Sequence, residues 1–191
     1  ECWKDGTATF MVLGDRCTRA CGFCLIDTRK PLEPDAHEPM RVAEAVKRMG
    51  LEFAVLTMVA RDDLADEGME HVAECIRAIR SVDSSIQVEA LISDARGTDS
   101  LDLLIAARPD VFNHNTETVP RLQRAVRPSA GYARSLGVLA RGKAAGLTVK
   151  SGLIVGMGET DEEVIGVLAD LADIGVNIVT IGQYLRPTTN H

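Results

Sequence analysis

"EPMRVAEAVKRMGLEFAVLTMV", residues 38–59, predicts a helix followed by a buried strand. Apolar side chains recur at every third position of the first half, which favours a helix, at Met40, Ala43, Val46 and Met49. Gly50 is a suitable residue for the C-terminal end of that helix. The apolar run at 52–59 is typical of a strand inside a sheet.

The same alternation extends through the whole chain. We expect strands at 7–14, 52–59, 86–92, 109–115, 147–156 and 177–185. We expect helices at 38–50, 68–82, 98–107, 117–126, 131–145 and 160–175, the last opening with Thr160 and Glu163 at capping-box spacing. Strict alternation implies a parallel sheet with right-handed crossovers. A doubly wound sheet and a TIM-type barrel both satisfy it, and we expect a partial (β/α)6 barrel, an α/β fold.

Length and composition limit the classes of function. The chain of 191 residues suits one domain, and its net charge of −7 disfavours a nucleic-acid groove. Its apolar runs are too short to span a bilayer. Five unevenly spaced cysteines do not suit a secreted disulfide framework, so we expect a reducing, cytoplasmic location, with no nucleic acid or membrane as partner.

Three of the five cysteines are concentrated in CTRACGFC, residues 17–24, directly after the first expected strand. Three thiolates can hold three corners of a four-iron cluster and leave one iron open to a small molecule. A zinc site with Cys2 as fourth ligand is the alternative. Cys75 lies on an apolar helix face and is expected to be a buried structural cysteine.

Polar residues follow every expected strand, at the end where barrels of this kind bind their ligands. Thr57 ends the second strand and could hold an amino group. Asn113, Asn115 and Glu117 follow the fourth and could bond ribose hydroxyls, or cap the next helix. Lys150 lies inside an apolar strand and needs an anionic partner.

The spacing Cys17-x3-Cys21-x2-Cys24, with Phe23 before the last cysteine, resembles the signature of the radical S-adenosylmethionine superfamily. GLIVGMGE (152–159) resembles a second motif of that superfamily, in which Ile154 would lie against the adenine. The resemblance implies that the three cysteines bind a [4Fe–4S] cluster whose open iron chelates S-adenosylmethionine. Lys150, Arg127 and Arg134 are then candidates for its carboxylate, and Gln183 and Tyr184 for its adenine edge.

Further stretches are similar to the lipoyl synthase family: ECW (1–3), GTATFM (6–11), RDDL (61–64), NHNTETVPRL (113–122) and TIGQYL (180–185). This implies sulfur insertion at carbons 6 and 8 of an octanoyl chain on a lipoyl-bearing carrier domain, with an electron donor as a second partner. In that family the sulfur comes from an auxiliary [4Fe–4S] cluster, and Cys2 matches the last of its three cysteines.

The family's other two auxiliary cysteines and its C-terminal serine motif have no counterpart here. We therefore expect a fragment, incomplete for sulfur donation: one core domain (1–191), with 1–6 as remnant of the auxiliary-cluster segment. A eukaryotic source would make the location mitochondrial. The alternatives are another radical enzyme, such as a biotin synthase relative, or a non-catalytic barrel stapled by zinc. Asp62 and Asp63 could orient an arginine, contact substrate or begin the next helix.

Overall fold

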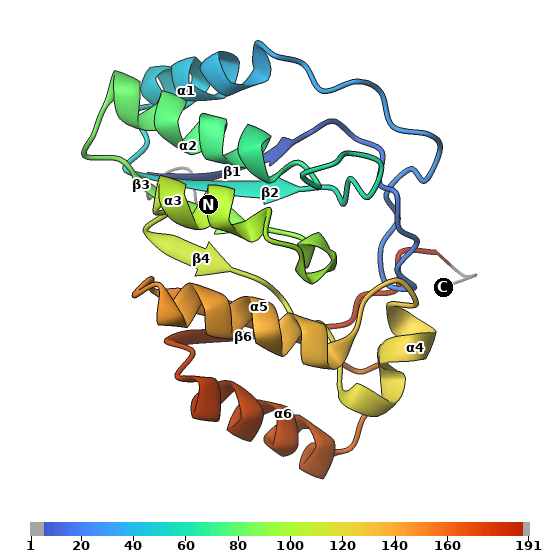
Figure 1. The fold of residues 1–191 in the computed structure, drawn as a ribbon. Coiled ribbons are helices and arrows are strands. Elements are labelled where there is room, and N and C mark those ends of the chain that lie inside the picture. Colours follow the sequence, from blue (N-terminus) through green and yellow to red (C-terminus); the bar gives the residue numbers. More distant parts are fainter. Residues whose placement is uncertain (1–5, 189–191) are drawn as a thin grey trace.

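Strands and helices alternate along the chain in the computed structural model, which describes residues 6–188 (Figure 1). The strands are β1 (Thr7–Val12), β2 (Phe53–Met58), β3 (Gln87–Leu91), β4 (Val111–Asn113), β5 (Val149–Val155) and β6 (Ile178–Gln183). The α-helices are α1 (Glu38–Met49), α2 (Met69–Val82), α3 (Leu101–Ala107), α4 (Gln123–Val126), α5 (Tyr132–Ala144) and α6 (Asp161–Ile174). Two 3-10 turns, η2 (Ala95–Gly97) and η3 (Pro120–Leu122), complete the order. The six expected strands and five of the six expected helices are confirmed, with ends that shift by a few residues. The helix expected at 117–126 is shorter: 120–122 form the 3-10 turn η3, and only the four residues of α4 are α-helical.

The six strands form one parallel sheet in the order β1-β2-β3-β4-β5-β6. A doubly wound sheet reverses its strand order at a switch point, whereas a barrel adds each strand beside the previous one. The consecutive order therefore decides between the two architectures that the alternation allowed. The chain is a partial (β/α)6 barrel, with β1 and β6 as the edges of its sheet.

The apolar core lies between the sheet and its helices, which follow one another along the same side of the sheet in Figure 1. Leu56 of β2 and Val88 of β3 are buried in one cluster with Ile76 of α2. A second cluster joins Leu153 of β5 to Leu171 of α6. This packing fixes the strands, and with them the loops that leave their carboxyl ends.

Two helix ends confirm the expected signals. Gly50 closes α1 in a left-handed conformation, with a φ of 63°. Thr160 and Glu163 form a complete capping box at the start of α6. The described helices include none that is long and apolar enough to cross a membrane.

The expected apolar stripe of α1 is partly wrong. Ala43 and Val46 are buried, but Met40 and Met49 are about half exposed. Each residue turns a helix by about 100°, so nine residues end roughly half a turn away from their start. Met40 and Met49 therefore cannot share a face, and Pro39 and Val42 complete the buried side.

Candidate functional site

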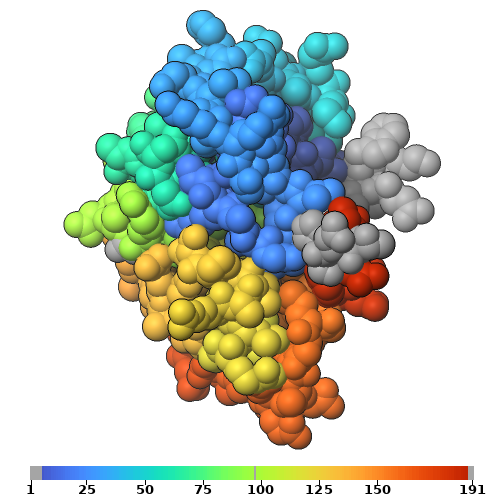
Figure 2. Space-filling model, turned by 90° about the vertical axis from the view of Figure 1, so that its right-hand side faces the viewer, coloured from blue at the N-terminus to red at the C-terminus, as the bar shows by residue number. Residues whose placement is uncertain are grey.

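A cavity of about 250 Å³ lies at the carboxyl ends of the central strands, against the cysteine loop (residues 17–24). Figure 2 views this end of the molecule, where the blue cysteine loop meets the yellow segment that carries α4. The cavity brings together eight of the residues that the sequence proposed: Cys17, Cys21, Phe23, Cys24, Thr57, Asn115, Glu117 and Arg127. An adjoining cavity of about 360 Å³ shares Phe23, Asn115 and Glu117 and extends along β5 and β6 to Ile154.

Backbone hydrogen bonds hold the cysteine loop at both of its ends. The Thr18 amide donates to the carbonyl of Ala60, just after β2, at 3.0 Å. The Gly22 amide donates to the carbonyl of Val126 at the end of α4, at 2.7 Å. The Cys17 Sγ accepts the Ala60 amide at 3.3 Å. The loop is therefore attached to two elements that are distant in the sequence.

The three thiols are free and line the same cavity. Within residues 6–188, no three His, Cys, Asp or Glu side chains lie close enough together to hold a metal ion. In an iron–sulfur cluster each thiolate binds a different iron, so the thiols do not have to meet at one point. Burial raises the pKa of the Cys21 thiol, and the nearby charge of Arg127 opposes that rise.

Asn115 and Glu117 form a wall that the two cavities share, and Gly152 lies against Asn115 in the adjoining cavity. A Cβ atom on Gly152 would lie 2.5 Å from Asn115 Oδ1, so only glycine leaves room for this amide. The Asn115 Oδ1 is buried and has no hydrogen-bond partner. Burial raises the pKa of the Glu117 carboxyl, with the charge of Arg127 acting in the opposite direction. This wall offers a ligand one unsatisfied amide oxygen and, beside it, a carboxyl group.

Arg127 brings a buried cation to the cavity. Its Nη1 donates to the carbonyl of Thr116 at 2.9 Å and to that of Asn115 at 3.2 Å. Both acceptors are neutral, and no carboxylate of the described residues forms an ion pair with Arg127. A buried, uncompensated charge is costly in a protein interior, so this guanidinium is suited to an anionic ligand.

Three of the proposed cofactor ligands are engaged elsewhere. Lys150 Nζ lies 2.9 Å from both carboxylate oxygens of Glu89, so the anion that Lys150 required is internal. Asn113 Nδ2 donates to the same carboxylate at 2.6 Å and not to a group in the cavity. Arg134 Nη1 donates to Asp94 at 3.2 Å. None of the three is among the residues that line either cavity.

The remaining proposed residues divide into three groups. Gln183 ends β6 and Tyr184 follows it, and neither is among the residues that line the two cavities. Cys75 is fully buried in α2, as expected, and burial raises the pKa of its thiol to about 12. Cys2, the proposed ligand of an auxiliary cluster or of zinc, lies outside the described residues.

Sequence reasoning missed Arg19, which lines the cavity, and Asp94, which lies 2.7 Å from Arg19. Asp62 and Asp63 each orient an arginine, one of the roles that the sequence allowed: Asp62 holds Arg19, and Asp63 holds Arg61. A basic residue between two of the clustered cysteines was the available signal for Arg19. Its partner Asp94 follows β3, and nothing in the local sequence links the two.

Comparison with known proteins adds the family. The model of the radical SAM superfamily matches residues 11–182. Lipoyl synthase of Rubrobacter xylanophilus is 55% identical over 100% of this chain and 60% of its own length. Lipoyl synthase of Chlorobaculum tepidum is 54% identical over 100% of this chain and 67% of its own. The hydrogenase maturase HydG of Carboxydothermus hydrogenoformans, at 19% identity, shares the fold with a TM-score of 0.75 over 93% of this chain and 44% of that one.

The chain thus spans about 60% of the length of one curated relative and about two thirds of the other. The family model runs from the end of β1 into β6 and includes the cysteine loop and the cavity wall. On these grounds the chain belongs to the lipoyl synthase family of the radical SAM superfamily.

Proposed function

We propose that this chain is the S-adenosylmethionine-binding core of an enzyme that inserts sulfur at carbons 6 and 8 of a protein-bound octanoyl chain. The observation that carries the proposal is the convergence of three free thiols, a buried unpaired arginine and an orphaned amide oxygen on one cavity. The donor set suits an iron–sulfur cluster, because thiolates are the ligands that such clusters use.

Cys17, Cys21 and Cys24 would hold the [4Fe–4S] cluster. When bound, the cluster supplies the electron that cleaves the sulfonium of S-adenosylmethionine and releases a 5′-deoxyadenosyl radical. The open mouth of the cavity beside Phe23 leaves space for the nucleotide against the wall of Asn115 and Glu117. Cluster and nucleotide would thus meet where the loop faces the sheet.

The polar groups of the cavity then have separate tasks. Arg127 pairs with the methionine carboxylate, since it is the cavity cation without a carboxylate of its own. Glu117 and Asn115 accept hydrogen bonds from the ribose hydroxyls. Ile154 contributes an apolar surface for the adenine in the adjoining cavity. Thr57, at the end of β2, accepts from the amino group.

The substrate and the other partners that we propose follow from the similarity to lipoyl synthases. An octanoylated lipoyl domain would bring the acyl chain to the cavity mouth, and a separate donor would deliver electrons. The sulfur would come from an auxiliary [4Fe–4S] cluster to which Cys2 belongs. The location that we propose is the cytoplasm, or the mitochondrion of a eukaryotic source.

The test is anaerobic loading with iron and sulfide, followed by reduction and addition of S-adenosylmethionine. We expect close to four irons per chain and the formation of 5′-deoxyadenosine. Cys24→Ala should abolish both, whereas Cys75→Ala, the same change at a buried cysteine of α2, should abolish neither. A colourless protein with one tightly bound zinc would contradict the proposal. An octanoylated peptide then tests sulfur insertion and separates this activity from that of a biotin synthase relative.

A further inference from the structure

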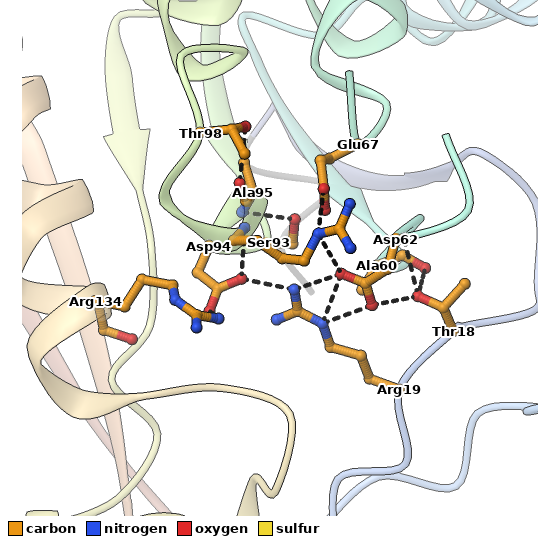
Figure 3. A network of polar contacts seen from close by, with 12 residues as sticks. Thr18, Arg19, Ala60, Asp62, Glu67, Ser93, Asp94, Ala95, Thr98 and Arg134 are labelled. Carbon is orange, nitrogen blue, oxygen red and sulfur yellow. Dashed lines mark hydrogen bonds and ion pairs between the residues drawn. The ribbon is translucent and has the colours of Figure 1, made fainter. Parts of the chain in front are cut away.

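Arg19 lies between two of the three cysteines and is only 6% exposed. Its Nη2 is 2.6 Å from Asp62 Oδ1 and 2.7 Å from Asp94 Oδ1, and its Nε donates to Asp62 Oδ2 at 2.9 Å. Figure 3 shows the guanidinium between the two carboxylates, which come from the segments after β2 and after β3. One side chain of the cysteine loop therefore joins the ends of two strands.

The surrounding contacts make this bridge specific. Thr18, the neighbour of Arg19, places its Oγ1 2.7 Å from Asp62 Oδ2 and accepts the Asp62 amide at 3.0 Å. Arg134 of α5 donates to the fully buried Asp94 from the other side, as Figure 3 shows. Arg96 is paired with Glu67 and lies near Asp62.

The positive and negative charges of the network around Arg19 are equal in number. It contains three arginines and three acids: Arg19, Arg96, Arg134, Asp62, Glu67 and Asp94. Each arginine of the network is therefore matched by a carboxylate, in contrast to Arg127. What the network fixes is the backbone of Thr18 and Arg19, and with it the direction in which Cys17 and Cys21 leave the sheet.

We infer that Arg19, clamped by Asp62 and Asp94, is a positioning residue that sets the geometry of the three cysteine thiols against the cavity wall. The inference rests on the proposed function, because it assigns the thiols to a cluster. It goes beyond it because Arg19, although it lines the same cavity, has its guanidinium taken up by Asp62 and Asp94 and is assigned to holding the loop. A lysine would keep the charge but could not reach both carboxylates with a planar fork.

The test compares Arg19→Lys with Arg61→Lys. Arg61 is the matched control, since it is 1% exposed and is held by both oxygens of Asp63 at 2.9 Å, on a residue next to Asp62. Its other contact is the Leu13 carbonyl, outside the cysteine loop. Asp94→Asn, which keeps the shape of the acceptor, provides a second variant in case Arg19→Lys folds poorly.

Two readouts follow. Hydrogen exchange of the metal-free protein should show the Thr18, Gly22 and Cys24 amides exchanging at least tenfold faster in Arg19→Lys, with α6 unchanged. After iron loading, the variant should bind S-adenosylmethionine about tenfold more weakly and show a smaller nucleotide-induced change in the electron paramagnetic resonance spectrum. Arg61→Lys should change neither.

Equal effects of the two lysine variants, or loop exchange as slow as in the wild type, would overturn the inference and leave the proposed function standing. A wild-type protein that takes up no cluster would overturn the proposed function instead. In that case Arg19 cannot be said to position cluster ligands. The hydrogen-exchange data still decide whether Arg19 orders the cysteine loop.

Discussion

Gly152→Ala tests the cavity wall directly, because the added methyl group would overlap the side chain of Asn115. Its Cβ would lie 2.5 Å from Asn115 Oδ1 and 2.8 Å from Asn115 Cγ. Ordinary contacts of this kind are 3.4 Å or longer, so the amide must move by about an ångström. The backbone conformation of Gly152 is open to alanine, so the effect comes from the contact and not from φ.

The magnitude follows from the cost of overpacking, about 1–3 kcal/mol for an extra carbon in a filled site. If the displaced Asn115 no longer meets the nucleotide, the lost hydrogen bond of about 0.5–1.5 kcal/mol corresponds to a dissociation constant for S-adenosylmethionine higher by roughly 2- to 13-fold. The free energy of unfolding should fall by no more than about 3 kcal/mol. The assay is anaerobic equilibrium binding to the iron-loaded protein, together with urea unfolding.

Gly137→Ala is the control, since a methyl group at this position of α5 meets no atom within 4 Å. It should raise stability by up to about 1 kcal/mol and leave binding unchanged. Gly152→Ala combined with Asn115→Ala should recover the lost stability but not the affinity. A Gly152→Ala protein that binds S-adenosylmethionine as tightly as the wild type would refute the role of this wall.

Three further outcomes are expected. Arg127→Lys should weaken binding of S-adenosylmethionine about tenfold in equilibrium dialysis, because a point charge replaces a planar fork. Arg121 is exposed and paired with Glu163, so Arg121→Lys should leave this binding unchanged. Cys75→Ala should lower the free energy of unfolding by about 1 kcal/mol, measured in urea, and leave the iron content unchanged, because this buried thiol only fills space. Burial lowers the pKa of His114 from 6.5 to about 4, so the unfolded chain takes up the proton first and stability falls as the pH drops through that window. The loss should be about 2 kcal/mol between pH 7 and pH 5, and His114→Gln should reduce it; an equal loss in that variant would contradict the assignment.

The fold was largely predictable because its signals are local. Runs of apolar residues mark the strands, and Gly50 and the Thr160–Glu163 pair mark helix ends. The predicted apolar face of α1 was partly wrong because an α-helix has 3.6 residues per turn, so side chains spaced three apart do not stay on one face. The order of the strands in the sheet depends on contacts between distant segments, so the sequence did not predict it. That order is what distinguishes a barrel from a doubly wound sheet.

The site was predictable only where its residues are close in sequence. The cysteine spacing identified the loop, and the residues after β4 identified the wall. The sequence could not rank Arg127, Arg134 and Lys150, because their acids are remote. Lys150 and Glu89 are 61 positions apart, and Arg134 and Asp94 are 40 apart. Only the folded chain shows that two of these cations are already paired.

The cavity has two walls that depend on different parts of the structure. Asn115 and Gly152 belong to the wall at β4 and β5, which a buried apolar core supports. The thiols belong to a loop that is attached by hydrogen bonds and by Arg19. Changes at sites without shared partners usually add in free energy. The losses of binding in Gly152→Ala and Arg19→Lys should therefore multiply in the double variant if each wall contacts the nucleotide by itself. A smaller combined loss would mean that the loop reaches its position by resting on the Asn115 wall, and that Arg19 only assists it.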